Sequence, residues 1–150
     1  MENIEKEIKK ISIVTGTVGQ DAHSIGTALL SRYLREKGFN VSELRALAQP
    51  EQFIEVSKET NAAAVLVSSL YGMAEIDLKG FKEKFVEAGL KDVLIYVGGY
   101  LKIGRHDWGE DEKRFKKMGF DRIYPPESSL EKVFNDLVED LKKKGQLCTA

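Results

Sequence analysis

The chain has 150 residues, of which 42% are hydrophobic and 31% charged, which is enough for one domain with a sizeable core. Its 23 Lys and Arg nearly balance 24 Asp and Glu, so neither nucleic acid nor an anionic membrane is indicated as a partner. No apolar run approaches the roughly 20 residues of a membrane span, and the charged N-terminus is unlike a signal peptide. The single cysteine, Cys148, forms no internal disulfide, which fits a reducing cytoplasm. We therefore expect one cytoplasmic domain, residues 1–150, with a core over 11–141, a charged head over 1–10 and a tail over 142–150.

Five short segments predict β-strands, and four of them are followed directly by Gly, Ser or Pro. They are residues 11–15, 41–47, 62–67, 93–97 and 122–124. The run 62–67 is continuously apolar, as expected of a strand that is covered on both faces.

Five amphipathic segments between and after these strands predict helices. They are residues 24 or 25 to 37, a segment from Pro50 with Phe53, Val56 and Thr60 inward, Leu78 to Ala88, a segment from Asp107 to near Gly119, and Leu130 to Leu141. Ser128-x-x-Glu131 is typical of a capping box at the start of the last helix. Strict alternation predicts an α/β fold, a flavodoxin-like (Rossmann-like) doubly wound sheet of five parallel strands in the order 2-1-3-4-5, with helices on both faces.

Chemically distinctive residues follow three of the predicted strands. Asp21 and His23 come after the first, Ser68 ends the third, and Gly98-Gly99 ends the fourth. In this strand order those ends are neighbours, and open α/β sheets bind ligands at the carboxyl ends of their strands. An Asp-x-His pair can hold one ring nitrogen and leave the other free for a metal, while paired glycines let a flat ligand approach the backbone. We expect a long, narrow slot with the Asp-His pair at its mouth.

The combination of these segments resembles a known fingerprint. The chain contains Asp-x-His-x-x-Gly, then Ser-x-Leu after 41 residues, then Gly-Gly after 27 more. This combination resembles the pattern of cobalamin-binding domains that bind the cofactor base-off and His-on. All of its positions are present: Asp21, His23, Gly26, Ser68, Leu70, Gly98 and Gly99. The flanking segments 68–72, 75–77, 79–80 and 118–126 resemble the small (sigma) subunit of glutamate mutase, also called methylaspartate mutase. The resemblance runs from about Ile11 to about Leu141.

The resemblance implies a role for each matching residue. His23 is implied as the axial ligand to the cobalt of adenosylcobalamin, with Asp21 hydrogen-bonded to the far side of its ring. The other implied cofactor-binding residues surround the corrin and its nucleotide tail: Gln20, Ala22, Ser24, Gly26, Ser68, Ser69, Leu70, Gly98, Gly99, Tyr100, Leu101, Lys102, Ile103 and Gly104. Thr17 stands where some related mutases carry a lysine, so no lysine relay is expected. His106, the other histidine, is expected to be a solvated loop residue.

The resemblance also implies the reaction and the partner. The implied activity is an isomerase, the adenosylcobalamin-dependent radical rearrangement of L-glutamate to threo-3-methylaspartate. A domain of this size covers only the lower face of the corrin, so the upper face needs another protein. The family supplies a large barrel-shaped (epsilon) subunit that holds the substrate, in an expected heterotetramer of two small and two large chains. Beyond the cobalt ligand, no catalytic residue is expected in this chain.

Other classes of protein share parts of this pattern. A phospho-receiver domain has the same fold but needs an aspartate after the third strand and a lysine after the fifth, where this chain has serines and Tyr124-Pro125. An FMN-binding electron carrier matches the hydroxyl- and glycine-rich segment 15–19, but leaves the Asp-His pair unexplained. A corrinoid carrier of a methyltransferase and the small subunit of an acyl-CoA mutase both fit the fingerprint, and they stay open as alternatives.

Overall fold

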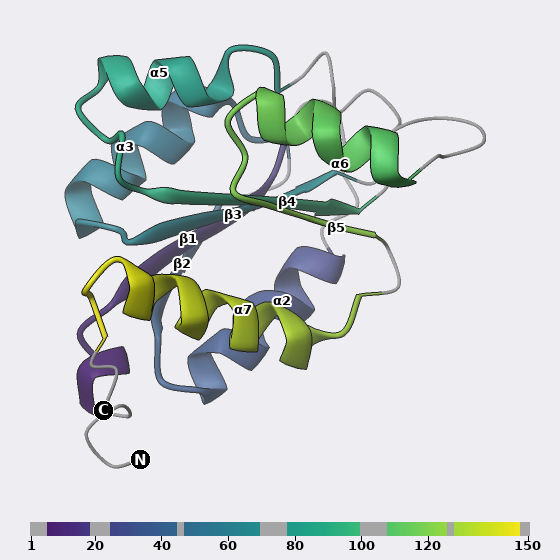
Figure 1. The fold of residues 1–150 in the computed structure, drawn as a ribbon. Helices are drawn as coiled ribbons and strands as arrows, with labels where there is room; N and C mark the ends of the chain where they lie inside the picture. Colours follow the sequence, from purple (N-terminus) through teal and green to yellow (C-terminus); the bar gives the residue numbers. More distant parts are fainter. Residues whose placement is uncertain are drawn as a thin grey trace.

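The structure is a computed structural model, and it describes residues 6–18, 25–44, 47–69, 78–99, 108–125 and 128–147. Five parallel strands form one sheet in the order β2-β1-β3-β4-β5, with helices on both faces (Figure 1). The strands are β1 (Ser12–Thr17), β2 (Asn40–Glu43), β3 (Ala64–Ser69), β4 (Leu94–Gly99) and β5 (Arg122–Tyr124). The helices are α2 (Ile25–Glu36), α3 (Pro50–Thr60), α5 (Phe81–Glu87), α6 (Trp108–Lys117) and α7 (Leu130–Lys143). The predicted flavodoxin-like fold and its strand order are therefore confirmed.

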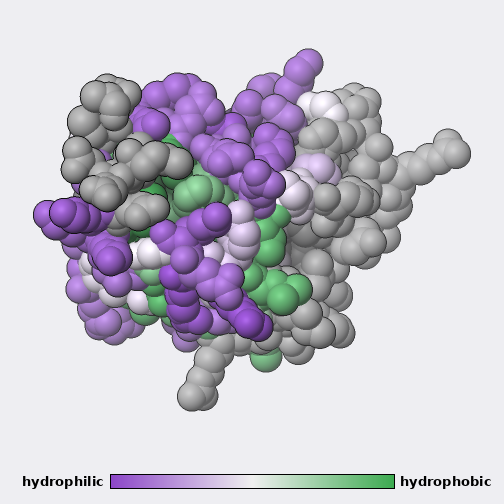
Figure 2. All heavy atoms as spheres, turned by 90° about the horizontal axis from the view of Figure 1, so that it is seen from below, coloured by the Kyte–Doolittle hydropathy of each residue, from purple (hydrophilic) through white to green (hydrophobic). Residues whose placement is uncertain are grey.

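The sheet has two differently covered faces, because side chains alternate along each strand. Helices α3, α5 and α6 cover one face, and α2 and α7 cover the other (Figure 1). We call the first the phenylalanine face, since its core contains Phe53, Phe81, Phe85, Phe115 and Phe120. The second, the α2–α7 face, has a core that includes Ile13, Leu34, Leu66, Leu137 and Leu141. Seen from outside, the side of α2 and α7 is mostly hydrophilic, with hydrophobic side chains showing only in patches (Figure 2).

Three strands run further than the sequence predicted. β1, β3 and β4 end at Thr17, Ser69 and Gly99, two residues past the expected ends of their apolar runs. The cause is cooperative pairing, because Thr17 pairs with Ser68 and the two serines of β3 pair with the two glycines of β4. The serines and glycines of the predicted site therefore lie within the strands and are held in the hydrogen-bonded sheet.

One strand is shorter than predicted. The expected strand over 41–47 is wrong at both ends, since β2 spans Asn40–Glu43. Leu47 has a φ of +66°, a left-handed conformation that a strand does not accommodate. Ala48 then pairs with Val18 in an isolated parallel bridge.

Two helix starts also differ from the prediction. The capping box at Ser128 is wrong, because Ser129 is the N-cap of α7 and its Oγ accepts a hydrogen bond from the Lys132 amide at 3.1 Å. The helix expected from Leu78 begins at Phe81 instead, since Gly80 adopts a φ of +77° at its N-cap. Within α3, Phe53 is buried as expected, but Ser57 is the other buried residue, while Val56 and Thr60 are half-buried.

The core extends past both ends of the expected range 11–141. Ile8, in a short helical turn, is 2% exposed, and Leu147 is 3% exposed. Both belong to the core of the α2–α7 face, so the head and the tail contribute apolar packing. Among the described residues, no helix is long and apolar enough to cross a membrane.

Candidate functional site

Most of the residues that the resemblance implies for cofactor binding lie outside the described part of the chain. These are Gln20, Asp21, Ala22, His23, Ser24, Leu70, Tyr100, Leu101, Lys102, Ile103 and Gly104. His106 lies outside it as well. Within the described ranges no cluster of His, Cys, Asp and Glu is suited to hold a metal. The roles implied for the residues outside the described ranges stay predictions. The described members of the set are Gly26, Ser68, Ser69, Gly98 and Gly99.

The described members come together at one edge of the sheet, as the strand order predicted. Ser68 lies in register with Thr17 on one side and with Gly98 on the other. Gly98 in turn lies in register with Tyr124 of β5. Gly26 lies in the first turn of α2, next in sequence to Thr27, whose Oγ1 is 2.8 Å from Oγ1 of Thr17 at the end of β1. Four neighbouring strands thus present their carboxyl ends to one place, where ligands of open α/β sheets bind.

A cavity of about 200 Å³ opens at these strand ends, and we call it the strand-end pocket. It lies between the sheet and the helices α2 and α7, and its walls are mostly apolar. Its lining comprises Thr27, Leu30, Leu66, Val67, Ser68, Tyr96, Val97, Gly98, Tyr124, Pro125, Ser128, Leu130 and Val133. Pockets that enclose a whole drug-sized ligand measure roughly 300–1,000 Å³, so this one suits a single flat ring system.

The floor of the strand-end pocket depends on small residues. A Cβ atom added at Gly98 would come within 3.4 Å of the Tyr124 Cβ, in ordinary van der Waals contact. Ser68 contributes only a hydroxymethyl group at the same level of the sheet. A larger side chain at either position would occupy the space that a ligand needs. The residues present therefore fit an apolar ring inserted between sheet and helices.

Two tyrosines form a wall of the pocket and are held by carboxylates of α7. The rings of Tyr96 and Tyr124 lie 5.7 Å apart between centroids. The Tyr96 hydroxyl donates to Asp140, and the Tyr124 hydroxyl donates to Asp136 at 2.9 Å. Burial, together with these hydrogen bonds to carboxylates, raises the pKa of both tyrosines well above the ordinary value. Both side chains therefore remain neutral hydrogen-bond donors with a fixed ring orientation.

Arg122 completes what we call the arginine–carboxylate network. Its Nε and Nη2 donate to the two carboxylate oxygens of Asp140 at 2.7 and 2.9 Å, a bidentate pair. Its Nη1 lies 3.2 Å from Asp136 Oδ1. Burial acts to raise the pKa of Asp140, but hydrogen bonds from Arg122 and Tyr96 outweigh it and hold that pKa below its ordinary value. The hydrogen bond to Asp140 raises the pKa of Arg122, so both groups stay charged.

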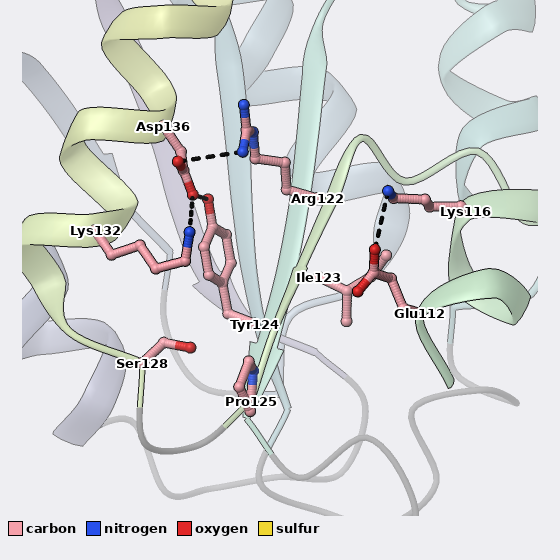
Figure 3. Close-up of a pocket in the computed structure, with 9 residues that line it drawn as sticks. All are labelled: Glu112, Lys116, Arg122, Ile123, Tyr124, Pro125, Ser128, Lys132 and Asp136. Atoms are coloured by element: carbon pink, nitrogen blue, oxygen red, sulfur yellow. Dashed lines mark hydrogen bonds and ion pairs between the residues drawn. The ribbon is translucent and has the colours of Figure 1, made fainter. Parts of the chain in front are cut away.

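A larger hollow of about 410 Å³ lies on the other side of Tyr124, between α6, β5 and α7 (Figure 3). Its charged side chains are paired with one another, since Lys116 contacts Glu112 at 3.0 Å and Lys132 contacts Asp136 at 3.1 Å. Because these charges already have partners, a ligand here would have to displace them. The smaller and more apolar strand-end pocket is therefore the better candidate for a ring ligand.

The sequence did not predict the two tyrosines or the network behind them. One pattern indicates the network in retrospect. Asp136 and Asp140 are one helical turn apart, on the same side of α7 as the buried Val133, Leu137 and Leu141. A carboxylate on the apolar side of a helix needs a buried donor as its partner, because an unpaired buried charge is very costly.

Comparison with known proteins identifies the family. Residues 11–112 match the B12 binding domain family. The glutamate mutase sigma subunit of Carboxydothermus hydrogenoformans is 49% identical over 134 residues, covering 89% of this chain and 98% of that protein. The sigma subunit of Clostridium tetani is 46% identical over 137 residues, covering 91% of this chain and all of that protein.

A solved structure agrees in fold. The monomethylamine corrinoid protein of Methanosarcina barkeri is similar with a TM-score of 0.68 over 91% of this chain, at 20% identity. This chain spans only 61% of that protein, and such low identity supports the fold alone. The two sigma subunits, in contrast, are matched over 98% or more of their own length at 46% identity or more. The chain therefore belongs to the family of glutamate mutase sigma subunits, and its residues 11–112 form a B12 binding domain.

Proposed function

We propose that this chain is the cobalamin-binding subunit of a glutamate mutase, an isomerase that interconverts L-glutamate and threo-3-methylaspartate. The observation that carries this proposal is the similarity to sigma subunits over 98% or more of their length. The likeness to a monomethylamine corrinoid protein, at 20% identity, supports the fold alone and gives no support to a methyl carrier. Identity to glutamate mutase subunits likewise favours glutamate over an acyl-CoA ester as the substrate.

The strand-end pocket supports a role for this chain in holding the cofactor's tail. In the proposed arrangement His23 would hold the cobalt, Asp21 would orient the His23 ring, and the strand-end pocket would hold the flat base of the cofactor. Ser68 and Gly98 would leave room for that base, and Tyr124 would form one wall beside it. Adenosylcobalamin, when bound, supplies the carbon radical that removes hydrogen from the substrate. The chain itself binds, orients and shields the lower side of the cofactor.

The remaining parts of the proposal concern the loop residues and the partner. Gln20, Ala22 and Ser24 would supply the backbone around the corrin and the tail, and Leu70 would line the slot for the base. Residues 100–104 would contact the ribose and phosphate of the tail. A large barrel subunit holds the substrate and closes the upper face, which keeps water and stray hydrogen donors away from the radical. The assembly proposed is a heterotetramer of two small and two large chains.

The axial ligand offers the sharpest test. Cob(II)alamin mixed with the full chain, labelled with ¹⁵N at histidine only, is examined by EPR in the presence of the large subunit. Coordination by a protein histidine changes the axial superhyperfine pattern from triplets to doublets. The cofactor's own base, which is unlabelled, keeps triplets.

The two histidines provide a matched pair of variants. We expect His23→Ala to abolish the doublets and to lose most of the mutase activity while circular dichroism shows an intact fold. His106→Ala is expected to keep the doublets. Triplets that persist in the wild-type complex would contradict His-on binding, and a collapsed fold in His23→Ala would make that residue structural.

A further inference from the structure

Four buried hydroxyls connect β1 to α2. Thr15 and Thr17 lie on β1, Thr27 and Ser31 lie on α2, and all four side chains are 2% exposed or less. Thr17 Oγ1 and Thr27 Oγ1 are 2.8 Å apart, and Thr15 Oγ1 and Ser31 Oγ are 2.7 Å apart. Burying hydroxyls costs free energy unless each finds a partner, and here each does.

The direction of part of this chain of hydrogen bonds is fixed by counting hydrogens. Ser31 Oγ donates its only hydrogen to the Thr27 carbonyl at 2.7 Å. Thr15 must therefore donate to Ser31. Both pairs converge on Thr27, whose hydroxyl is bonded to Thr17 and whose carbonyl accepts from Ser31. Thr27 is thus the point at which the start of α2 is fixed to β1.

The Thr17–Thr27 pair lies close to the segment that carries the implied cobalt ligand. One residue, Val18, separates Thr17 from residue 19, and two residues separate residue 24 from Thr27. Thr27 also lines the strand-end pocket, and Thr17 is in register with Ser68, which lines it too. The Thr15–Ser31 pair is of the same kind but is further from the segment by two residues on β1 and four on α2.

We propose that Thr17 and Thr27 are positioning residues for the cobalamin site. Their shared hydrogen bond sets the separation and the rotation between the end of β1 and the first turn of α2. It therefore fixes, relative to each other, the two described residues that precede and follow the segment carrying His23 in the sequence. This inference rests on the proposed function for the role of His23. It adds two residues, on described elements, to the machinery of the site.

The direction of the Thr17–Thr27 hydrogen bond distinguishes a positioning role from a role in packing alone, and a double replacement by valine tests the difference. A valine has nearly the shape of a threonine, so replacing both members of a pair leaves no unpaired buried hydroxyl and little void. The double variant Thr17→Val/Thr27→Val should therefore fold with a melting temperature close to the wild type. It lacks the hydrogen bond that selects one arrangement of β1 and α2. The matched control is Thr15→Val/Ser31→Ala, which removes the deeper pair.

The first measurement is cobalamin affinity of the full chain, alone and with the large subunit. We expect Thr17→Val/Thr27→Val to bind about tenfold more weakly, the effect of losing roughly one hydrogen bond from the bound arrangement. The control should stay within about twofold of the wild type. The proposal is overturned if Thr17→Val/Thr27→Val also stays within that range, or if both double variants lose affinity equally.

The second measurement does not depend on the cofactor. Amide hydrogen exchange over residues 18–27 of the free chain should be faster in Thr17→Val/Thr27→Val than in the control, because these two residues are no longer fixed relative to each other. Equal exchange in the two variants would overturn the proposal. A wild-type chain that binds no cobalamin in either condition would overturn the proposed function instead, and the exchange result would still decide the role of the hydroxyl pair.

Discussion

The two faces of the sheet are built from different chemistry. On the phenylalanine face, Phe81 contacts the rings of Phe53, Phe85 and Phe120 at centroid distances of 5.6, 5.0 and 5.9 Å. On the α2–α7 face the core is interrupted by hydrogen-bonded polar groups. Among the described residues, the buried polar side chains of that face are Thr15, Thr17, Thr27, Ser31 and Asp136, whereas α3 on the other face contributes Ser57.

The comparison indicates that the two faces of the sheet have different roles. Aromatic packing gives much stability and little directionality, whereas a satisfied hydrogen-bond network gives modest net stability and fixes geometry. The strand-end pocket opens only onto the α2–α7 face, between the two helices that carry the polar groups. We therefore expect the largest changes in the free energy of unfolding from substitutions on the phenylalanine face, and changes in cobalamin binding from substitutions at the strand-end pocket on the α2–α7 face.

The largest effect is expected from Phe81→Ala on the phenylalanine face. Phe81 is fully buried at the centre of the aromatic cluster, so truncation should lower the free energy of unfolding by about 3–5 kcal/mol. Urea denaturation measures the loss. Val86→Ala, on the same helix at a side chain that is 48% exposed, is the control and should cost less than about 1 kcal/mol. Equal losses in the two variants would contradict the assignment of Phe81 to the centre of the core.

The next largest effect is expected from Ser68→Leu in the strand-end pocket. The added side chain occupies part of a cavity of only about 200 Å³, so cobalamin should bind about 100-fold more weakly. The melting temperature should change little, because the leucine enters an existing space. Ser42→Leu, in the half-buried part of β2 away from the pocket, is the matched control and should leave binding unchanged. Unchanged affinity in Ser68→Leu would place the cofactor's base elsewhere.

The fold could be predicted because its signals are local and repeated. Strands β1, β3 and β4 contain apolar runs with Ile or Val, and α7 has a clear apolar stripe that includes Val133, Leu137 and Leu141. The ends of the strands were less predictable, because Ser68 is a poor strand residue and Thr17 directly follows a glycine. They are extended because they pair with each other across the sheet. That pairing depends on contacts between segments 51 residues apart, which local patterns do not encode.

The site was predictable only in part, for a similar reason. Asp21, His23, Ser68 and the glycine pair belong to a fingerprint with fixed spacing, so the sequence could single them out as candidates, although Asp21 and His23 lie outside the described residues. Tyr96 and Arg122, in contrast, resemble ordinary strand residues. Their roles arise because α7 brings Asp140 to both of them, with the guanidinium held bidentately. Such a partner is set by tertiary packing and has no signature at either strand.

A smaller effect is expected from Asp140→Asn in the arginine–carboxylate network. Loss of the charged partner of Arg122 should lower the free energy of unfolding by about 2 kcal/mol near neutral pH. The folded-state pKa of Asp140 lies below its ordinary value of 3.8, so its stabilisation is complete well above that pH and is lost as the pH falls through the folded pKa. The difference between wild type and Asp140→Asn should therefore shrink in acid.

Urea unfolding at about pH 7 and about pH 3.5 measures this dependence. Glu139→Gln is the control at the same arginine, because Glu139 lies 3.5 Å from Arg122 with a side chain that is 56% exposed. An exposed ion pair contributes about 0–1 kcal/mol, so this variant should change little at either pH. A difference for Asp140→Asn that grows in acid would contradict the sign of the pKa shift.

The smallest effects come from two buried serines, one beneath each face. Among the described residues Ser57 Oγ has no hydrogen-bond partner, whereas Ser31 Oγ is bonded to both Thr15 and the Thr27 carbonyl. Removing an unsatisfied hydroxyl relieves a desolvation cost, so Ser57→Ala should leave the free energy of unfolding unchanged or raise it by up to about 1 kcal/mol. Ser31→Ala should lower it by about 1 kcal/mol, because Thr15 then lacks its acceptor. Chemical denaturation of both variants measures the two changes in the free energy of unfolding, which should have opposite signs. Changes of equal sign would mean that buried hydroxyls contribute alike to stability on the two faces. The proposed difference between a face that gives stability and a face that fixes geometry would then lose its basis.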